Sequence, residues 1–262
     1  MVDLKIENKK GFLFDLDGVL TMEGDPLPGA IEVISLLDKK QIPFRIVTNL
    51  TTKSTLNQFE HLSDIGFPVE RSQIFNPMRA AVHFLEKKVS PEVYFMMRED
   101  TRREFSKFDE SDHDPDYVII GDMADTWNFY IMNKAFRLIM NGAEIIALHK
   151  GRYYKVKGGL RMDIGAFVAG LEYVTGKKAI VMGKPSHDFF QMALEHMNVR
   201  PEEAVLVGDD IQSDVGGAQN AGIMGILATS GKYREGDEKR FGVTPDARIK
   251  SIADVIPYIE NM

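Results

Sequence analysis

A regular alternation of short apolar stretches and amphipathic stretches limits the folds open to this chain. Residues 12–14 and 43–47 are apolar and short enough to be buried strands. Residues 28–37 and 53–64 have the apolar spacing of helices, and the first of these begins with Pro28. Two strand–helix pairs in succession predict an α/β fold, in which parallel strands are joined by helical crossovers.

The pattern changes in the middle of the chain and resumes after about a hundred residues, an ordinary domain size. We therefore expect residues 77–180 to form an inserted α/β domain, and residues 1–76 and 181–262 to form the domain that it interrupts. The other expected strands are 74–75, 93–97, 117–120, 144–148, 152–156, 179–182, 204–207 and 225–228. The other expected helices are 77–88, 127–140, 163–174, 187–197, 213–220 and 252–259, with a helix and then a loop at 101–116 and a surface loop at 231–245.

Charge and composition exclude several classes of partner and of chemistry. The 262 residues carry a net charge of −7, so we expect no nucleic-acid partner. The absence of cysteine excludes disulfides, thiolate metal sites and a cysteine nucleophile. The first residues lack the apolar core of a signal peptide, and no apolar run reaches the length of a membrane span. We expect a cytoplasmic protein without a membrane partner.

Polar side chains follow four of the expected strands directly. They are Asp15, Asp17, Thr48, Asn49, Lys184, Asp209 and Asp214. We expect the four strands to share one parallel sheet, whose carboxyl ends meet at one edge, where such folds bind ligands. Carboxylates hold Mg²⁺, lysine supplies a point charge, and hydroxyl and amide groups bind phosphoryl oxygens. The set therefore suits phosphoryl transfer.

Each of these residues also has a structural explanation. A D-x-D pair can simply end a strand, Asn49 can be a turn residue, Asp214 can be a helix N-cap, and Lys184 can be a solvated lysine. Neither an EF-hand loop nor a Walker-A motif fits the sequence as well. The agreement among four strand ends favours a catalytic site.

Four segments carry a resemblance to a known family. DLDGVLT, Thr48-Asn49, Gly183-Lys184-Pro185 and GDDIQSD resemble, in order, the four motifs of the haloacid dehalogenase superfamily. The insertion between the second and third motifs resembles that of the NagD-like branch. The resemblance covers nearly the whole chain. It implies a Rossmann-like, doubly wound parallel-sheet core with an inserted α/β cap domain.

The resemblance also implies catalytic roles. Asp15 would attack phosphorus, and Asp17 would protonate the leaving group and then activate water. Thr48 and Asn49 would bind the transferring phosphoryl group, and Lys184 would bridge that group and Asp15.

A metal site is implied at the same edge of the sheet. Asp15, the backbone carbonyl of Asp17, and Asp209 would bind Mg²⁺, and Asp214 would bind or orient it. Asp210 is expected only to help place the loop. The six histidines show no ligand spacing and are expected to be structural or on the surface.

The cap is expected to close over a small phosphorylated substrate. The resemblance suggests that segment 161–165 lies over the active site, which makes Asp163 a candidate substrate-binding residue. Asp163 can equally be the cap of helix 163–174. Leu50 departs from the TNN sequence of many NagD-like enzymes, which bears on substrate contacts. The exposed faces of the cap are candidates for a homodimer contact.

The expected function is therefore a Mg²⁺-dependent phosphatase that works through an aspartyl-phosphate. The substrate is left open among phosphosugars, nucleotide monophosphates, phosphoglycolate, pyrophosphate and phosphoamino acids. Two alternatives remain at this point: a phosphotransferase or phosphomutase, which would retain the phosphoryl group, and a non-catalytic regulatory protein of the same fold.

Overall fold

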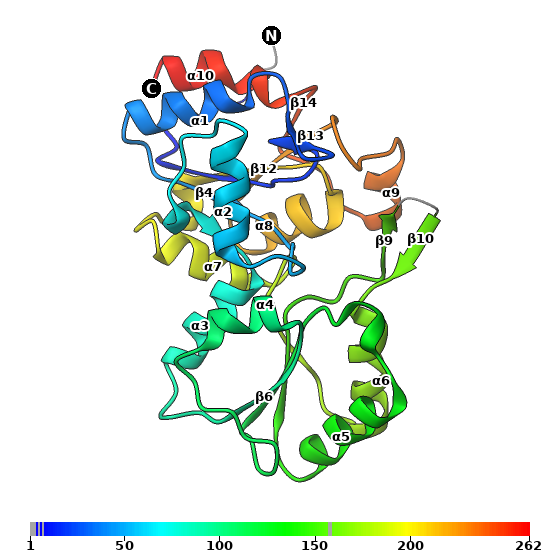
Figure 1. Ribbon diagram of the computed structural model, residues 1–262. Coiled ribbons are helices and arrows are strands. Elements are labelled where there is room, and N and C mark those ends of the chain that lie inside the picture. The colour runs from blue at the N-terminus through cyan, green and yellow to red at the C-terminus, as the bar shows by residue number, and fades with distance from the viewer. Residues whose placement is uncertain (1–3, 5, 7, 157–158) are drawn as a thin grey trace. The chain divides into compact units, whose positions relative to one another are not determined.

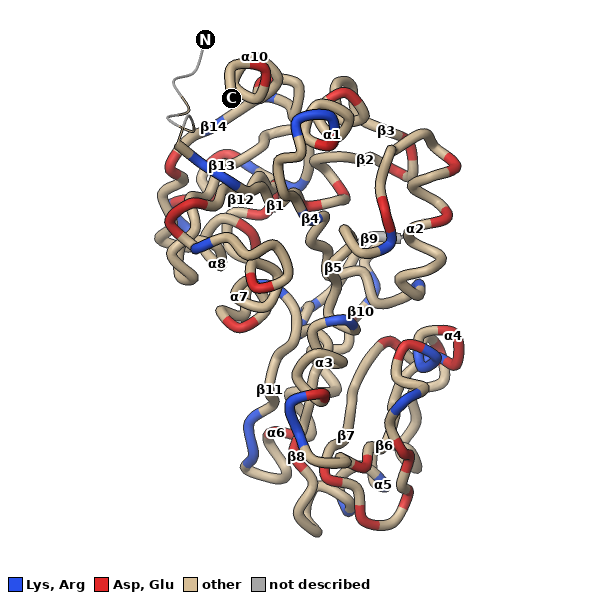
Figure 2. Tube along the Cα trace, turned by 90° about the vertical axis from the view of Figure 1, so that its left-hand side faces the viewer, with Lys and Arg blue, Asp and Glu red and all other residues tan. Residues whose placement is uncertain are grey.

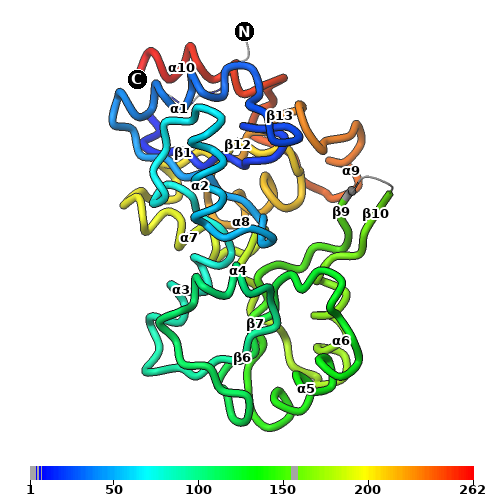
Figure 3. Tube along the Cα trace, in the orientation of Figure 1, coloured from blue at the N-terminus to red at the C-terminus, as the bar shows by residue number. Residues whose placement is uncertain are grey.

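The computed structural model describes residues 4, 6, 8–156 and 159–262. The described chain divides into two compact units. The core unit contains the residues up to Thr48, Leu56–Phe75 and Lys184–Met262, and the cap unit contains Asn49–Thr55 and Asn76–Gly183. In the core unit, the blue N-terminal and the orange-to-red C-terminal segments lie side by side although they are far apart in the sequence (Figure 3).

Across the described residues, the core unit contains a six-stranded sheet in which all neighbouring strands are parallel. The order is β14-β13-β12-β1-β4-β5. β4 and β5 therefore follow β1 on one side of the sheet, and β12, β13 and β14 follow one another on the other side. The sheet is therefore doubly wound, as expected, and its order reverses between β1 and β12. The strands are β1 (Gly11–Phe14), β4 (Phe44–Val47), β5 (Ile74–Phe75), β12 (Ala204–Gly208), β13 (Met224–Ala228) and β14 (Ala247–Ile249), and β2 (Thr21–Met22) pairs with β3 (Asp25–Pro26) in a short antiparallel ribbon.

Helices cover both faces of this sheet. Phe12 and Phe14 are buried on one face, in a cluster with Val33 of α1 and Ile259 of α10, because side chains alternate along a strand. Figure 1 shows α1 and α10 on one side of the strands and α7 and α8 on the other. The helical segments of the core are α1 (Ala30–Lys39), α2 (Thr55–Asp64), η1 (Arg71–Gln73), α7 (His187–Glu195), η4 (Pro201–Glu203), η5 (Ile211–Gly216), α8 (Gly217–Asn220), α9 (Asp237–Phe241), η6 (Ile252–Val255) and α10 (Ile256–Glu260).

The described residues of the cap unit form a four-stranded parallel sheet in the order β11-β8-β7-β6. Val118 of β7 packs in one buried cluster with Leu138 of α5 and Val168 of α6. Acidic and basic residues lie side by side around α4 (Figure 2). The elements are α3 (Pro77–Glu86), β6 (Val93–Met96), α4 (Glu99–Arg102), η2 (Arg103–Phe105), β7 (Tyr117–Ile120), η3 (Ala124–Thr126), α5 (Phe129–Met140), β8 (Glu144–Ala147), the antiparallel hairpin of β9 (Tyr153–Val156) and β10 (Gly159–Met162), α6 (Gly165–Thr175) and β11 (Ile180–Val181).

One expected strand belongs to a different sheet from the one predicted. The strand expected at 179–182 is β11, and it pairs with β8 in the cap sheet instead of joining the core sheet. A short apolar run indicates a strand but does not say which neighbour will supply its backbone partners. Lys184 therefore enters the core from the connection between β11 and α7, and not from the end of a core strand.

Smaller differences concern loops and helix starts. The loop expected at 231–245 contains α9, and segment 101–116 contains only the short turns α4 and η2. The helix expected from residue 213 begins at Ile211, and the one expected from residue 163 begins at Gly165. In the part of the chain that is described, we find no helix with both the length and the apolar character needed to cross a bilayer.

Candidate active site

Three carboxylates gather at the carboxyl edge of the core sheet within the described chain. Asp15 follows β1 directly, Asp209 follows β12 directly, and Asp214 lies in η5. All three residues are at most 5% exposed, and one oxygen of each lies within 4.8 Å of the others. β1 and β12 are neighbours at the point where the strand order reverses, the place where doubly wound sheets bind ligands.

Lys184 is buried between two of these carboxylates. Its Nζ donates to Asp15 Oδ1 at 2.5 Å and to the Val47 carbonyl at 3.1 Å, and lies 2.7 Å from Asp214 Oδ1. Burial alone would lower the pKa of Lys184, but the charges of Asp15 and Asp214 outweigh burial and raise it. Lys184 therefore stays protonated at neutral pH, and it is not the solvated lysine of the alternative interpretation.

One buried ammonium does not balance three buried carboxylates. Burial, with the charges of Asp15 and Asp214, raises the pKa of Asp209 to about 8. Burial also raises the pKa of Asp214 to about 6, although Lys184 acts in the opposite direction. The cluster thus holds protons that exposed carboxyl groups would release, and a further positive charge would displace them.

The donor set fits a divalent metal ion. Asp209 Oδ2 accepts the backbone N–H of Lys232 at 2.6 Å, whereas the buried Oδ1 has no hydrogen-bond partner among the residues that the structure describes. Buried acceptors are normally satisfied, and carboxylate oxygens are the ligands that hard divalent cations prefer. Asp15, Asp209 and Asp214 could therefore hold such an ion.

The turn after β1 depends on a glycine. Gly18 has a φ of +95°, which side chains other than hydrogen rarely allow, and a Cβ there would lie 2.1 Å from Asp209 Oδ2. Asp17 precedes it, and its Oδ1 accepts a hydrogen bond from Thr21 Oγ1 at 3.5 Å. Part of Asp17 is exposed, and desolvation of the rest, together with the charge of Asp15, raises its pKa. Asp17 can therefore donate a proton at a higher pH than an ordinary carboxyl group.

Asp214 is not the N-cap of its helix. Asp210 takes that position, because its Oδ1 accepts the N–H groups of Gln212 at 3.0 Å and Ser213 at 2.8 Å. Asp214 lies one turn later, and its Oδ2 accepts the N–H of Asp210 at 3.1 Å. A Cβ on Gly208 would lie 2.2 Å from the Cβ of Asp214, so this glycine allows the close approach of η5 to the end of β12.

The two residues of the second predicted motif, Thr48 and Asn49, belong to different units. Thr48 follows β4 in the core unit, is 3% exposed, and donates its N–H to the Phe75 carbonyl at 3.2 Å. Asn49 belongs to the cap unit, where a Cβ on Gly183 would lie 2.6 Å from its Oδ1. Only Thr48 is thus part of the same unit as the acidic cluster, and the phosphoryl-binding role of both residues stays a prediction.

Asp163 lies in the cap unit and is not the N-cap of α6, which is Ile164. Its Oδ1 accepts the N–H of Ile164 at 2.7 Å, and its Oδ2 lies 3.8 Å from His149 Nδ1. Burial lowers the pKa of His149, so the imidazole is neutral at pH 7. His149 accepts the N–H of Gly151 at 3.1 Å, and its other ring nitrogen is 3.2 Å from Thr51 Oγ1.

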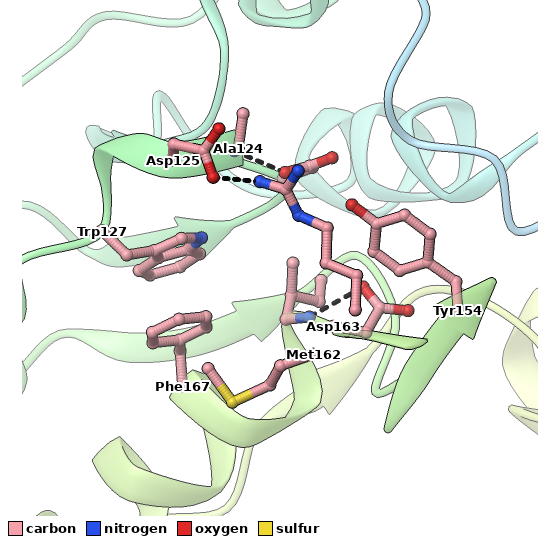
Figure 4. A pocket seen from close by; sticks show the side chains of 10 residues that line it. Ala124, Asp125, Trp127, Tyr154, Met162, Asp163 and Phe167 are labelled. Atoms are coloured by element: carbon pink, nitrogen blue, oxygen red, sulfur yellow. Dashed lines mark hydrogen bonds and ion pairs between the residues drawn. The ribbon is translucent and has the colours of Figure 1, made fainter. Parts of the chain in front are cut away.

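Asp163 borders a cavity of about 280 Å³ that lies wholly within the cap unit. Figure 4 shows the rings of Trp127 and Phe167 face to face, and their centroids are 3.8 Å apart. Arg161 forms an ion pair with Asp125 across the cavity. The lining residues are Asp122, Ala124, Asp125, Trp127, Tyr154, Arg161, Met162, Asp163, Ile164 and Phe167.

Lys232 is a site residue that the sequence analysis missed. Its backbone N–H binds Asp209, and the charges of Asp15, Asp209 and Asp214 raise the pKa of its ammonium against the opposing effect of burial. The sequence feature that could have indicated Lys232 is its position four residues after the end of β13, the neighbour of β12. The many charges of segment 231–245 led instead to the prediction of a surface loop.

Two family models match the sequence. The model described as "Haloacid dehalogenase-like hydrolase" matches residues 12–110, and the HAD-hydrolase-like model matches residues 181–255. The chain is 40% identical over 252 residues to "Haloacid dehalogenase-like hydrolase domain-containing protein 2" of Homo sapiens, with 95% of each chain covered. It is 34% identical over 262 residues to "Phospholysine phosphohistidine inorganic pyrophosphate phosphatase" of Homo sapiens, with 97% of this chain and 96% of the relative covered.

Solved structures agree with these relatives. NagD from E. coli K-12 is 28% identical, with a TM-score of 0.86, and the match covers 94% of this chain and 98% of NagD. The p-nitrophenyl phosphatase from Archaeoglobus fulgidus is 26% identical, with a TM-score of 0.89, and the match covers 97% and 100% of the two chains. The fold class and the enzyme class, a phosphatase, are thereby confirmed. The chain belongs to the haloacid dehalogenase-like hydrolase family.

Proposed function

We propose that this chain is a cytoplasmic, Mg²⁺-dependent phosphatase that hydrolyses a small phosphorylated metabolite through an aspartyl-phosphate on Asp15. The observation that carries the proposal is the buried Oδ1 of Asp209, which lies beside Asp15 and Asp214 and has no hydrogen-bond partner within the described ranges. A carboxylate nucleophile, a fixed lysine and an acidic cluster that can accept a cation are together the parts that phosphoryl transfer requires.

In the first step, a carboxylate oxygen of Asp15 bonds to phosphorus while the bond from phosphorus to the leaving-group oxygen breaks. Lys184 keeps the Asp15 carboxylate in place through its hydrogen bond to Oδ1. Asp17 gives its proton to the departing oxygen, which its raised pKa supports. Thr48 and Asn49 are proposed to bind the oxygens of the transferring phosphoryl group.

In the second step, the ionised Asp17 takes a proton from water. The water oxygen bonds to phosphorus, the bond between phosphorus and Asp15 breaks, and inorganic phosphate leaves. Asp17 is thereby protonated and Asp15 ionised again, so the site returns to its starting state.

Asp15, Asp209 and Asp214, with the backbone carbonyl of Asp17, would hold the Mg²⁺ ion. When bound, the ion supplies positive charge that offsets the charge of the carboxylates and of the phosphoryl oxygens. Lys184 remains paired with Asp15 and Asp214 and adds a second, fixed positive charge.

We further propose that residues 77–180 act as the cap that selects the substrate, and that Asp163 and Asn49 contribute to this selection. The aromatic and acidic cavity that Asp163 borders supports a ligand-binding role for this segment. A relative named for phospholysine, phosphohistidine and inorganic pyrophosphate supports a small substrate with a P–N or P–O–P bond, and a solved structure named for p-nitrophenyl phosphate supports an ester. Self-association through the exposed faces of the cap remains part of the proposal.

Phosphate release from a panel of small phosphate compounds tests the proposal. The panel is assayed with and without Mg²⁺ for wild type, Asp15→Asn and Asp64→Asn, the last being an exposed acid on α2. We expect turnover that requires Mg²⁺, disappears in Asp15→Asn and persists in Asp64→Asn. Equal release by wild type and Asp15→Asn would contradict the proposal, and lasting retention of the phosphoryl group on the protein would indicate a phosphomutase.

A further inference from the structure

Two lysines face the acidic cluster, and their situations differ. Lys184 is 5% exposed and has its Nζ beside Asp15, Asp214 and the Val47 carbonyl. The side chain of Lys232 is exposed, and its Nζ makes no ion pair or hydrogen bond with any residue in the described ranges. Lys184 is therefore occupied by the protein, whereas the ammonium of Lys232 is available to a ligand.

The backbone that carries Lys232 is fixed against the turn after β1. Ser230 Oγ donates to the Gly18 carbonyl at 2.6 Å, and the Lys232 N–H donates to Asp209 Oδ2 at 2.6 Å. A Cβ on Gly231 would lie 2.0 Å from Asp209 Oδ2 and 2.7 Å from the Gly18 Cα. The loop thus packs directly against Gly18, the residue after Asp17. The backbone of Lys232 is therefore held in a defined position.

The backbones of the two lysines approach the site from different segments of the core unit. Lys184 binds Asp15, the proposed nucleophile. Lys232 directly follows Gly231, which packs against Gly18, the residue after Asp17, the proposed proton donor. Since Asp17 must reach the leaving-group oxygen, an exposed lysine whose backbone lies beside the Asp17–Gly18 turn is within side-chain reach of the leaving group.

We propose that the Lys232 ammonium binds an anionic group that the leaving group carries close to its bridging oxygen. This inference rests on the proposed phosphatase function and deepens it. The preferred substrates would be phosphoric anhydrides and esters of anionic alcohols, in preference to esters with an uncharged leaving group. A compact ammonium with rotatable donors suits both a second phosphoryl group and a carboxylate.

Steady-state kinetics of Lys232→Gln test the proposal with three probes. Inorganic pyrophosphate carries a phosphoryl group on the leaving side, phosphoglycolate carries a carboxylate, and p-nitrophenyl phosphate carries neither. Lys232→Arg keeps the charge, and Lys239→Gln removes an exposed lysine of the nearby α9 as a matched control. A hydrogen bond to a charged group is worth about 1.5–3 kcal/mol, so its loss corresponds to roughly ten- to hundredfold in kcat/KM.

We expect Lys232→Gln to lower kcat/KM for one or both anionic probes, mainly through KM, by at least roughly tenfold more than for p-nitrophenyl phosphate. Lys232→Arg should restore most of the loss, and Lys239→Gln should behave as wild type. An equal loss on all three probes, or no loss on any, would overturn the proposal. Loss for pyrophosphate alone identifies a phosphoryl group as the ligand, and loss for phosphoglycolate alone identifies a carboxylate.

A binding measurement separates this proposal from the proposed function. Calorimetric titration of Asp15→Asn with pyrophosphate and with inorganic phosphate, in the presence of Mg²⁺, needs no turnover. Adding Lys232→Gln to Asp15→Asn should weaken pyrophosphate binding at least roughly tenfold more than phosphate binding. Equal weakening of both ligands, or of neither, would overturn the role of Lys232 even if wild type hydrolysed none of the probes.

Discussion

Replacement of Lys184 by methionine in the metal-free protein should destabilise the core unit strongly. The substitution removes the ammonium that contacts Asp15 Oδ1, Asp214 Oδ1 and the Val47 carbonyl, and leaves both carboxylates buried. Removing one partner of a buried ion pair typically costs about 3–5 kcal/mol, because the remaining charge stays desolvated. For a chain of this size, that cost corresponds to a melting temperature lower by roughly 6–20 °C.

The cost should also depend on pH in a defined direction. The folded pKa of Asp214 is about 6, above its ordinary value of 3.8, so its ionisation destabilises the folded state as pH rises between these values. Without Lys184, which lowers this pKa, the folded pKa of Asp214 rises further, and the destabilisation extends to higher pH. The difference in stability between wild type and Lys184→Met should therefore be larger at pH 7.5 than at pH 5.

Thermal unfolding followed by circular dichroism, with a chelator present, measures both effects. Lys239→Met is the matched control, because Lys239 is exposed on α9. The double variant Lys184→Met/Asp214→Asn should be more stable than Lys184→Met, since it removes one of the uncompensated charges. A loss of only about 2 °C, which corresponds to 1 kcal/mol or less, would refute the reasoning, as would a larger loss at pH 5 than at pH 7.5.

Three further predictions follow from the same contacts. Gly231→Ala should lower the melting temperature and weaken divalent-metal binding, because the added Cβ would lie 2.0 Å from Asp209 Oδ2. Gly170→Ala is the control, because a Cβ there would meet no described atom within 4 Å. Equal behaviour of the two variants would contradict this prediction. In the metal-free protein, Asp209 has a folded pKa of about 8 against an ordinary value of 3.8, so Asp209→Asn should stabilise the protein increasingly, relative to wild type, as pH rises from 4 to 8. Urea denaturation should show this as a slope of up to about 1.4 kcal/mol per pH unit, and a slope of the opposite sign would exclude the assigned protonation. Asp17→Asn should reduce the hydrolysis of alkyl phosphates more than that of p-nitrophenyl phosphate, whose leaving group needs little protonation; equal losses would argue against a proton-donor role.

Much of the core site is predictable because it depends on local pattern and on sheet geometry. The apolar stretch at Phe12 and Phe14 predicts a buried strand, and parallel strands place their carboxyl ends at one edge. Asp15 and Asp209 therefore meet once β1 and β12 are neighbours. Asp15 and Asp209 could be recognised before any coordinates because each directly follows a strand, and the family motifs supplied Lys184 and Asp214, which do not.

Other features could not be predicted because they depend on tertiary partners. The pairing of β11 with β8 depends on which sheet edge the chain brings the strand to, and this is not encoded in the two residues of the strand. The choice of Asp210 over Asp214 as N-cap depends on where the helix begins, which sequence patterns locate only to within a few residues. The contact of Lys232 with Asp209 forms only because Gly231 and Gly18 pack closely together, although their positions in the sequence are distant.

The central claim is that Asp15 carries the phosphoryl group during turnover. Rapid acid quenching during the hydrolysis of a good substrate, followed by mass spectrometry of the peptide that contains Asp15, tests it most directly. We predict that this peptide gains the mass of one phosphoryl group on Asp15 and that the gain disappears in Asp15→Asn. The gain should increase in Asp17→Asn if that substitution slows hydrolysis of the aspartyl-phosphate more than its formation. Full turnover with no phosphoryl group on Asp15 at any quench time, and with activity retained in Asp15→Asn, would contradict the account.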